Sequence, residues 1–155
     1  MDKEKYINIV DTANNYYCAV RVLWEKMEGN ESTDSLSECM QLIFPTINIG
    51  ALACELYLKA LVYKNKNCLK IEHDLGELFK LISDDDKRWC KEKFNEKISG
   101  NTNFDVELEN VKMAYTKWRY LYERGNSEKD KEPIRPDSII CLMEILHDLC
   151  KQYKR

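Results

Sequence analysis

Hydrophobic residues near the start of the chain recur every three or four positions. They run from Tyr6 to Met27, which corresponds to about six turns of helix. This spacing places them on one face, so it predicts a long amphipathic helix. The stretch at positions 29–34 (Gly-Asn-Glu-Ser-Thr-Asp) is rich in turn formers and ends the pattern.

The next region is the most apolar part of the chain. A helical pattern begins near Ser35 or Ser37, meets Pro45 and continues to about Lys64. Proline is expected either to start a helix or to kink one. The apolar run at 47–62 is slightly short for a membrane span and carries charges near its middle. We therefore interpret it as the central helix of a bundle.

Two shorter helices are expected to follow. Asp74 and Glu77 have the spacing of a capping box, in which Asp74 accepts from the backbone N–H of the third helical position and Glu77 reaches back. The apolar face of this helix contains Leu75, Leu78, Phe79 and Ile82. The next helix starts at the acidic stretch 83–86 and ends at Gly100. Its inward residues are Trp89, Phe94 and Ile98.

Two further helices complete the pattern. The clearest periodic line consists of Phe104, Leu108, Val111, Tyr115, Trp118 and Tyr122. After a polar loop at 125–132, Pro136 suits the first turn of a last helix. The inward residues of this helix are Ile139, Leu142, Met143, Leu146, Leu149, Cys150 and Tyr153. The predicted fold is all-α, a mainly antiparallel bundle of about five to six helices in a single domain over residues 1–155.

Charge and cysteine content narrow the functional classes. The formal net charge of -3 over 155 residues argues against coating nucleic acid by bulk charge, but is compatible with a local basic patch. The chain has seven cysteines, an odd number, and none has Cys-x-x-Cys spacing. Because the chain also begins with a charged stretch rather than an apolar signal region, we expect reduced thiols and a cytoplasmic location.

Glu55 requires an explanation, because a charge in an apolar helix needs a partner or shifts its pKa. Lys59 lies four residues later, in the order that favours an ion pair within the helix. Alternatively, Glu55 meets a basic residue of another helix, for which Arg119 is the best candidate. Arg119 borders an apolar face and is followed by Tyr120 and Glu123. It either grips a carboxylate or phosphate, or belongs to an internal network between helices.

The two histidines offer fewer options. His73 precedes the Asp74 cap, where the positive helix end favours its neutral form, and it acts either as a general acid or base or as a structural cap. His147 and Cys150 lie three apart, but two histidines and no paired cysteines do not complete a zinc shell. No cysteine is placed beside a histidine for activation, and the glycines are isolated. We therefore expect no metal and no cofactor.

Three linked segments carry a resemblance to a known family. They read Gly-Ala-Leu-Ala-Cys-Glu-Leu-Tyr-Leu-Lys-Ala-Leu at 50–61, Glu-His-Asp-Leu-Gly-Glu-Leu-Phe at 72–79 and Trp-Arg-Tyr-Leu-Tyr-Glu at 118–123. In this order they resemble the HEPN superfamily. Many of its members have a central helix like Ala-x-Glu-Leu-x-Leu-Lys-Ala-Leu, then a His-x-Leu helix start, and later an Arg-Tyr-x-Tyr-Glu element. The resemblance implies an all-α, mainly antiparallel bundle that commonly dimerises.

The resemblance also implies two classes of function. HEPN proteins include metal-independent ribonucleases of toxin-antitoxin, phage-defence and CRISPR systems, and noncatalytic partners of minimal nucleotidyltransferases. The ribonucleases carry an Arg a few residues before a His. Here no Arg occupies the ten positions before His73, and eleven residues separate Arg135 from His147. This sequence therefore departs from the ribonuclease pattern.

The resulting hypothesis is a noncatalytic or noncanonical HEPN-like binding module, homodimeric, in a prokaryotic defence, stress or toxin-antitoxin context. Its ligand is a nucleotide, RNA or a protein partner, and no membrane is involved. The expected polar set is Glu55, Lys59, His73, Asp74, Arg119, Tyr120 and Glu123. Two alternatives stay open: a metal-independent ribonuclease in which Arg119 stabilises phosphate charge and His73 moves a proton, and an accessory partner of a minimal nucleotidyltransferase.

Overall fold

The computed structural model describes residues 2–29, 35–98, 103–119 and 136–154, with the backbone alone for 35–40 and 113–119. Within these ranges the chain forms six helices and no strand. The helices are α1 (Lys3–Glu28), α2 (Ser35–Lys66), α3 (Leu75–Leu81), α4 (Asp84–Lys97), α5 (Phe104–Arg119) and α6 (Pro136–Tyr153). The predicted all-α bundle is confirmed.

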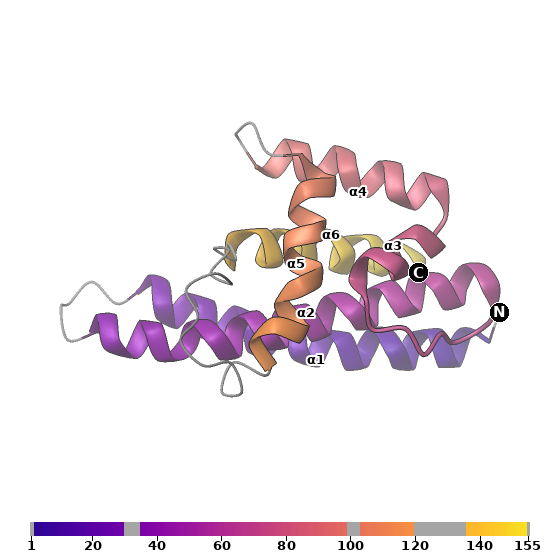
Figure 1. The fold of residues 1–155 in the computed structure, drawn as a ribbon. Helices are drawn as coiled ribbons and strands as arrows, with labels where there is room; N and C mark the ends of the chain where they lie inside the picture. The colour runs from indigo at the N-terminus through magenta and orange to yellow at the C-terminus, as the bar shows by residue number, and fades with distance from the viewer. Residues whose placement is uncertain (1, 30–34, 99–102, 120–135, 155) are drawn as a thin grey trace.

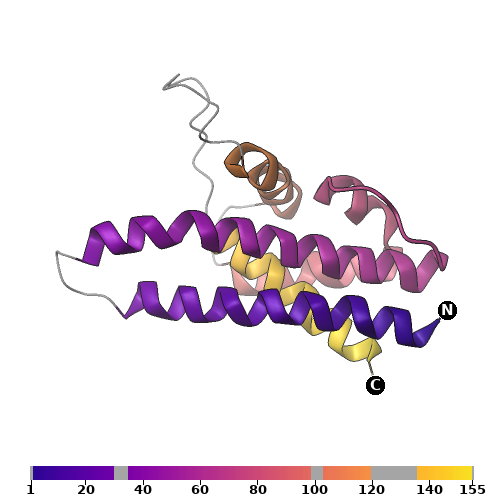
Figure 2. The same cartoon turned by 90° about the horizontal axis from the view of Figure 1, so that it is seen from below.

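The two longest helices, α1 and α2, lie side by side and antiparallel (Figures 1 and 2). Helix α6 packs against α2 and crosses the pair obliquely, and α4 packs on α6. Helix α5 runs across α2 (Figure 1) and also contacts α3. Because α2 contacts α1, α3, α5 and α6, it is the central helix that its apolar sequence predicts.

Helix α2 is continuous through Pro45, which lies inside it rather than at its start. Proline lacks the N–H that would bond to the carbonyl four residues earlier, and that residue, Gln41, is exposed to water. The neighbouring Thr46 hydroxyl donates to the Leu42 carbonyl at 2.7 Å. These two features satisfy backbone groups around the proline, so the helix continues.

The core is built from the helical faces that the periodicity predicts. Tyr6, Val10, Ala13 and Val20 of α1 are buried, as are nearly all inward residues expected on α6. Tyr153 is the exception, because it is 37% exposed. At Gly50 the close approach of α6 requires glycine, since a Cβ there would lie 2.8 Å from Ile139 Cγ2.

Helix starts agree with the predicted caps except in one detail. Asp74 caps α3 by accepting from the Glu77 N–H at 3.0 Å, and Ser83 caps α4 by accepting from the Asp86 N–H at 3.2 Å. The expectation that Glu77 reaches back to Asp74 is wrong. The Asp74 N–H donates to Glu72 instead, and the Glu77 carboxylate binds Lys80. A nearer carboxylate therefore replaces the predicted partner.

The segment Gln41–Lys66 of α2 is long and apolar enough to cross a membrane by length and composition alone. Half of its most apolar window is buried inside the bundle. The central helix of a water-soluble bundle meets the same length and composition criteria, so this feature is weak evidence for a membrane span.

Candidate functional site

The Glu55 carboxylate lies on α2 with its side chain 5% exposed, and it has two donors on one oxygen. The Lys59 ammonium nitrogen lies 2.8 Å from Glu55 Oε1, which confirms the predicted pair within the helix. His73 Nδ1 lies 2.9 Å from the same oxygen. A charge buried to this degree is stable only with such partners. We call these three residues the Glu55 site.

Among the described residues, the partner that Glu55 finds outside its own helix is His73. The sequence favoured Arg119 for this role. Arg119 is the last residue of α5, and its side chain lies outside the described part of the structure, as do Tyr120 and Glu123. The predicted pairing of Glu55 with Arg119 thus stays a prediction.

Local hydrogen bonds fix the backbone that carries His73. Glu72 Oε1 accepts the N–H of His73 at 2.8 Å and the N–H of Asp74 at 2.9 Å. These two backbone donors, first that of Asp74, lower the pKa of the Glu72 carboxyl. The Asp74 carboxylate caps α3 and lies 3.4 Å from the Lys112 ammonium of α5. These four contacts hold His73 and the start of α3 in place.

The contact with Glu55 defines the chemistry of the His73 ring. A carboxylate only accepts hydrogen bonds, so Nδ1 must carry a proton and donate it. In the neutral imidazole this leaves a lone pair on Nε2. Because 63% of the His73 side chain is exposed, this ring can accept a hydrogen bond from a ligand or take up a proton.

The second histidine lies in a polar network between α1, α2 and α6. His147 Nδ1 is 3.0 Å from the Tyr57 hydroxyl oxygen and 3.2 Å from Asn14 Oδ1. The Tyr57 hydroxyl donates to Asn14 Oδ1 at 2.8 Å. The Tyr17 ring stacks on the imidazole with centroids 4.3 Å apart. Burial lowers the pKa of His147, so the network favours the neutral ring.

Among the described residues, no group of three or more histidine, cysteine, aspartate or glutamate side chains is arranged to hold a metal ion. The Cys150 thiol is buried and donates to the Tyr57 carbonyl at 3.7 Å, while His147 joins the network above. Burial raises the pKa of Cys150 and Cys54, and raises that of Cys90 to about 12. These thiols are therefore protonated at neutral pH and are not nucleophiles.

A second buried carboxylate joins three helices at the opposite end of α2 from Pro45. Asp86 of α4 is 1% exposed, accepts from the Tyr153 hydroxyl at 2.6 Å and lies 3.2 Å from the Lys64 ammonium. The Lys64 ammonium also sits 3.2 Å from the centroid of the Tyr153 ring. Because all three groups bind one another, we interpret this cluster as a structural contact that holds the end of α6 against α2 and α4.

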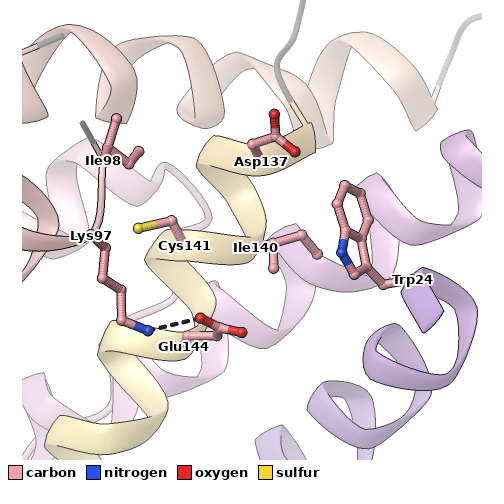
Figure 3. Close-up of a pocket in the computed structure, with 7 residues that line it drawn as sticks. All are labelled: Trp24, Lys97, Ile98, Asp137, Ile140, Cys141 and Glu144. Atoms are coloured by element: carbon pink, nitrogen blue, oxygen red, sulfur yellow. Dashed lines mark hydrogen bonds and ion pairs between the residues drawn. The ribbon is translucent and has the colours of Figure 1, made fainter. Parts of the chain in front are cut away.

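A pocket of about 380 Å³ lies between α1, α4 and α6 (Figure 3). Its lining residues are Trp24, Lys97, Ile98, Asp137, Ile140, Cys141 and Glu144. Glu144 accepts from Lys97 at 2.8 Å and from Arg21 at 2.9 Å. Burial raises the pKa of the Cys141 thiol to about 11. With its carboxylate Glu144 occupied by two cations and its thiol protonated, the pocket offers less chemistry than the Glu55 site.

Sequence reasoning missed the contacts that link distant helices. Tyr57 and Asn14 are 43 positions apart, and 133 positions separate Asn14 from His147. Tyr57 reads as one apolar residue among many in α2. The only signal in the sequence is that His147 lies on a largely apolar helix. That signal does not specify a partner.

Comparisons with protein-family models, with curated proteins and with solved structures find no match. The Glu55 site is the only one of the sites above in which a buried carboxylate holds an exposed imidazole ring.

Proposed function

We propose that this chain is a noncatalytic or noncanonical HEPN-like binding module that acts as a homodimer in the cytoplasm, in a prokaryotic defence, stress or toxin-antitoxin context. The all-α fold is compatible with this family. Three residues of the polar set named from the resemblance, Glu55, Lys59 and His73, meet at one place. This convergence is the observation that supports the proposal.

The arrangement suits binding because it presents a fixed ring to solvent. Glu55 is buried and therefore fixed in place. It holds Nδ1 of His73 while the rest of the ring faces outward. Positioning of this kind costs little on association, because the side chain is already ordered.

Two exposed lysines close to His73 in the sequence support a phosphate-bearing ligand. Lys66 and Lys70 are exposed in and after the last turn of α2, a few residues from His73. Neither lysine has an ion-pair partner among the described residues. Exposed lysines attract phosphate groups even on a chain of net negative charge. The ligand class proposed is therefore RNA or a nucleotide.

Fluorescence anisotropy with a labelled single-stranded RNA tests this proposal. We expect binding by the wild type, strong loss for His73→Ala and partial loss for Lys66→Ala. Lys26→Ala is the matched control, because Lys26 is an exposed lysine near the far end of α1. Equal binding by the wild type and His73→Ala, or no binding by the wild type, would contradict the proposal.

A second candidate function is cleavage of the same ligand by a noncanonical ribonuclease site. The observation in its favour is the 2.9 Å contact between His73 Nδ1 and Glu55, which orients the ring as a general acid or base is oriented. In this mechanism Nε2 moves the proton and Arg119 stabilises charge on the phosphate.

Incubation of labelled RNAs with the wild type, His73→Ala and Arg119→Ala separates the two functions. Cleavage by the wild type alone would favour the ribonuclease. Equal cleavage by all three proteins, or none, would exclude it and leave the binding module.

A further inference from the structure

The segment 68–72, which connects α2 to α3, forms an exposed apolar surface. It runs along the outside of α2 (Figures 1 and 2). Ile71 is 95% exposed and Leu69 is 44% exposed. Two large aliphatic residues exposed close together on a connecting segment form a candidate contact surface.

The backbone of this segment is also free to pair. Lys70 and Ile71 make no backbone hydrogen bond to any described residue. Their N–H and C=O groups therefore face water, and the segment belongs to no helix. An extended stretch with free backbone groups is a template for pairing with another strand.

We propose that segment 68–72 pairs antiparallel with the same segment of a second copy of this chain, in the register centred on Ile71. In this register Ile71 lies opposite Ile71, and Lys70 lies opposite Glu72 on both sides of the two-fold axis. Opposite charges directly across a strand pair stabilise it, as do facing apolar residues.

The neighbouring registers lack this complementarity. A register centred on Lys70 places two ammonium groups opposite each other, which is destabilising. A register centred between Lys70 and Ile71 sets each lysine against an isoleucine. Of these three registers, charge complementarity favours the one centred on Ile71, and two-fold pairing of the chain with itself satisfies it.

The Glu72 carboxylate retains an oxygen for this contact. Oε1 accepts the two backbone N–H groups at the start of α3, whereas Oε2 has no hydrogen bond within the described residues. Oε2 therefore is available to Lys70 of the second copy. The pairing also places Leu69 of the second copy opposite His73, so the dimer would cover one side of the Glu55 site.

This inference rests on the homodimer of the proposed function and adds the face through which it forms. Its test uses Lys70→Glu and Glu72→Lys, each purified separately. Each variant alone sets like charges opposite each other, so both are expected to be monomers by sedimentation equilibrium. Mixed together they restore two opposite-charge pairs, and the heterodimer is expected to bind at least about tenfold more tightly than either homodimer.

Ile71→Asp provides a second measurement. It is expected to yield a monomer, while Val22→Asp, which changes another exposed branched residue near the far end of α1, leaves the wild-type mass unchanged. Thermal melts confirm that each variant is folded. If the wild type is a dimer that none of these substitutions weakens, the face is wrong and the homodimer stands. A wild type that is monomeric up to near-millimolar concentration overturns both.

Discussion

The two histidines of this protein lie in contrasting surroundings, although both contact the same turn of α2. His73 is exposed and donates to the buried carboxylate of Glu55. His147 is partly buried and shares its Nδ1 with the neutral groups of Tyr57 and Asn14. The Glu55 carboxylate holds the His73 ring toward solvent, whereas a hydrogen-bond network surrounds the His147 ring.

This difference separates a binding group from a structural one. Removing a group from the Tyr57 network leaves buried polar atoms without partners, so its main effect is on stability. Removing His73 takes one of two donors from Glu55 but leaves Lys59 in place, so its main effect is on a ligand. The substitutions below test this division in order of their expected effect on stability.

Glu55→Ala is expected to have the largest effect. It leaves the Lys59 ammonium without its partner where only 15% of that side chain is exposed, so we expect a loss of about 3 kcal/mol in the free energy of unfolding. Urea denaturation measures it. Adding Lys59→Ala is expected to recover part of the loss, because the unpaired charge is then absent.

The matched control is Glu77→Ala, which removes an exposed carboxylate from an ion pair with Lys80 on α3. Its cost is expected to stay within about 0.5 kcal/mol. If Glu55→Ala costs no more than this control, the burial of the Glu55 site does not carry the energy assigned to it.

Tyr57→Phe is expected to cost about 1–3 kcal/mol, because it leaves Asn14 Oδ1 and His147 Nδ1 short of one partner. Tyr63→Phe is the control. Tyr63 is also buried, but its hydroxyl makes no hydrogen bond to the described residues. Thermal and urea unfolding of both variants give the difference, and equal losses would show that the network adds nothing.

The stability of the fold is expected to depend on pH through His147. Burial holds the pKa of His147 below its ordinary value of 6.5, so the unfolded chain binds more protons than the folded one as pH falls. The stability from the neutral ring is present above pH 6.5 and is lost as pH falls through the lower, folded-state pKa. Asp148 and Glu144 oppose this shift, while Lys151 and Lys154 add to it.

The unfolding free energy of the wild type minus that of His147→Gln, measured across this range, isolates the histidine from the carboxylates. We expect the difference to shrink steadily below pH 6.5. If this difference does not change with pH, the His147 ring is more solvated than the structure shows.

His73→Ala is expected to have the smallest effect on stability, about 1 kcal/mol or less, because Glu55 keeps Lys59 as a partner and most of the His73 side chain is already in water. Chemical denaturation beside His147→Gln measures the contrast directly. A loss for His73→Ala as large as that of Tyr57→Phe would make His73 a structural residue.

Local features of this fold could be predicted from the sequence, because helices and caps depend on neighbouring residues. The long helix from Tyr6, the caps at Asp74 and Ser83, and the pair of Glu55 with Lys59 all follow from spacings of three or four positions. The role of Glu72 at the start of α3 was missed, since a carboxylate just before a cap has no strong preference of its own.

Contacts between helices could not be predicted in the same way. The Tyr6 hydroxyl donates to the Cys150 carbonyl across 144 positions, and His73 meets Glu55 across 18. Such partners depend on how α2, α3 and α6 cross, which periodicity does not determine. The family resemblance named His73 and Glu55 together, but it did not specify their contact.

The measurement that tests the account most directly follows the imidazole nitrogens of both histidines by NMR, on ¹⁵N-labelled protein titrated with a short single-stranded RNA. His73→Ala and His147→Gln assign the two sets of signals. We predict that the ring signals of His73 shift with RNA and that those of His147 stay in place. Shifts at His147 alone, or at neither ring, would contradict the claim that the Glu55 site is where this module binds.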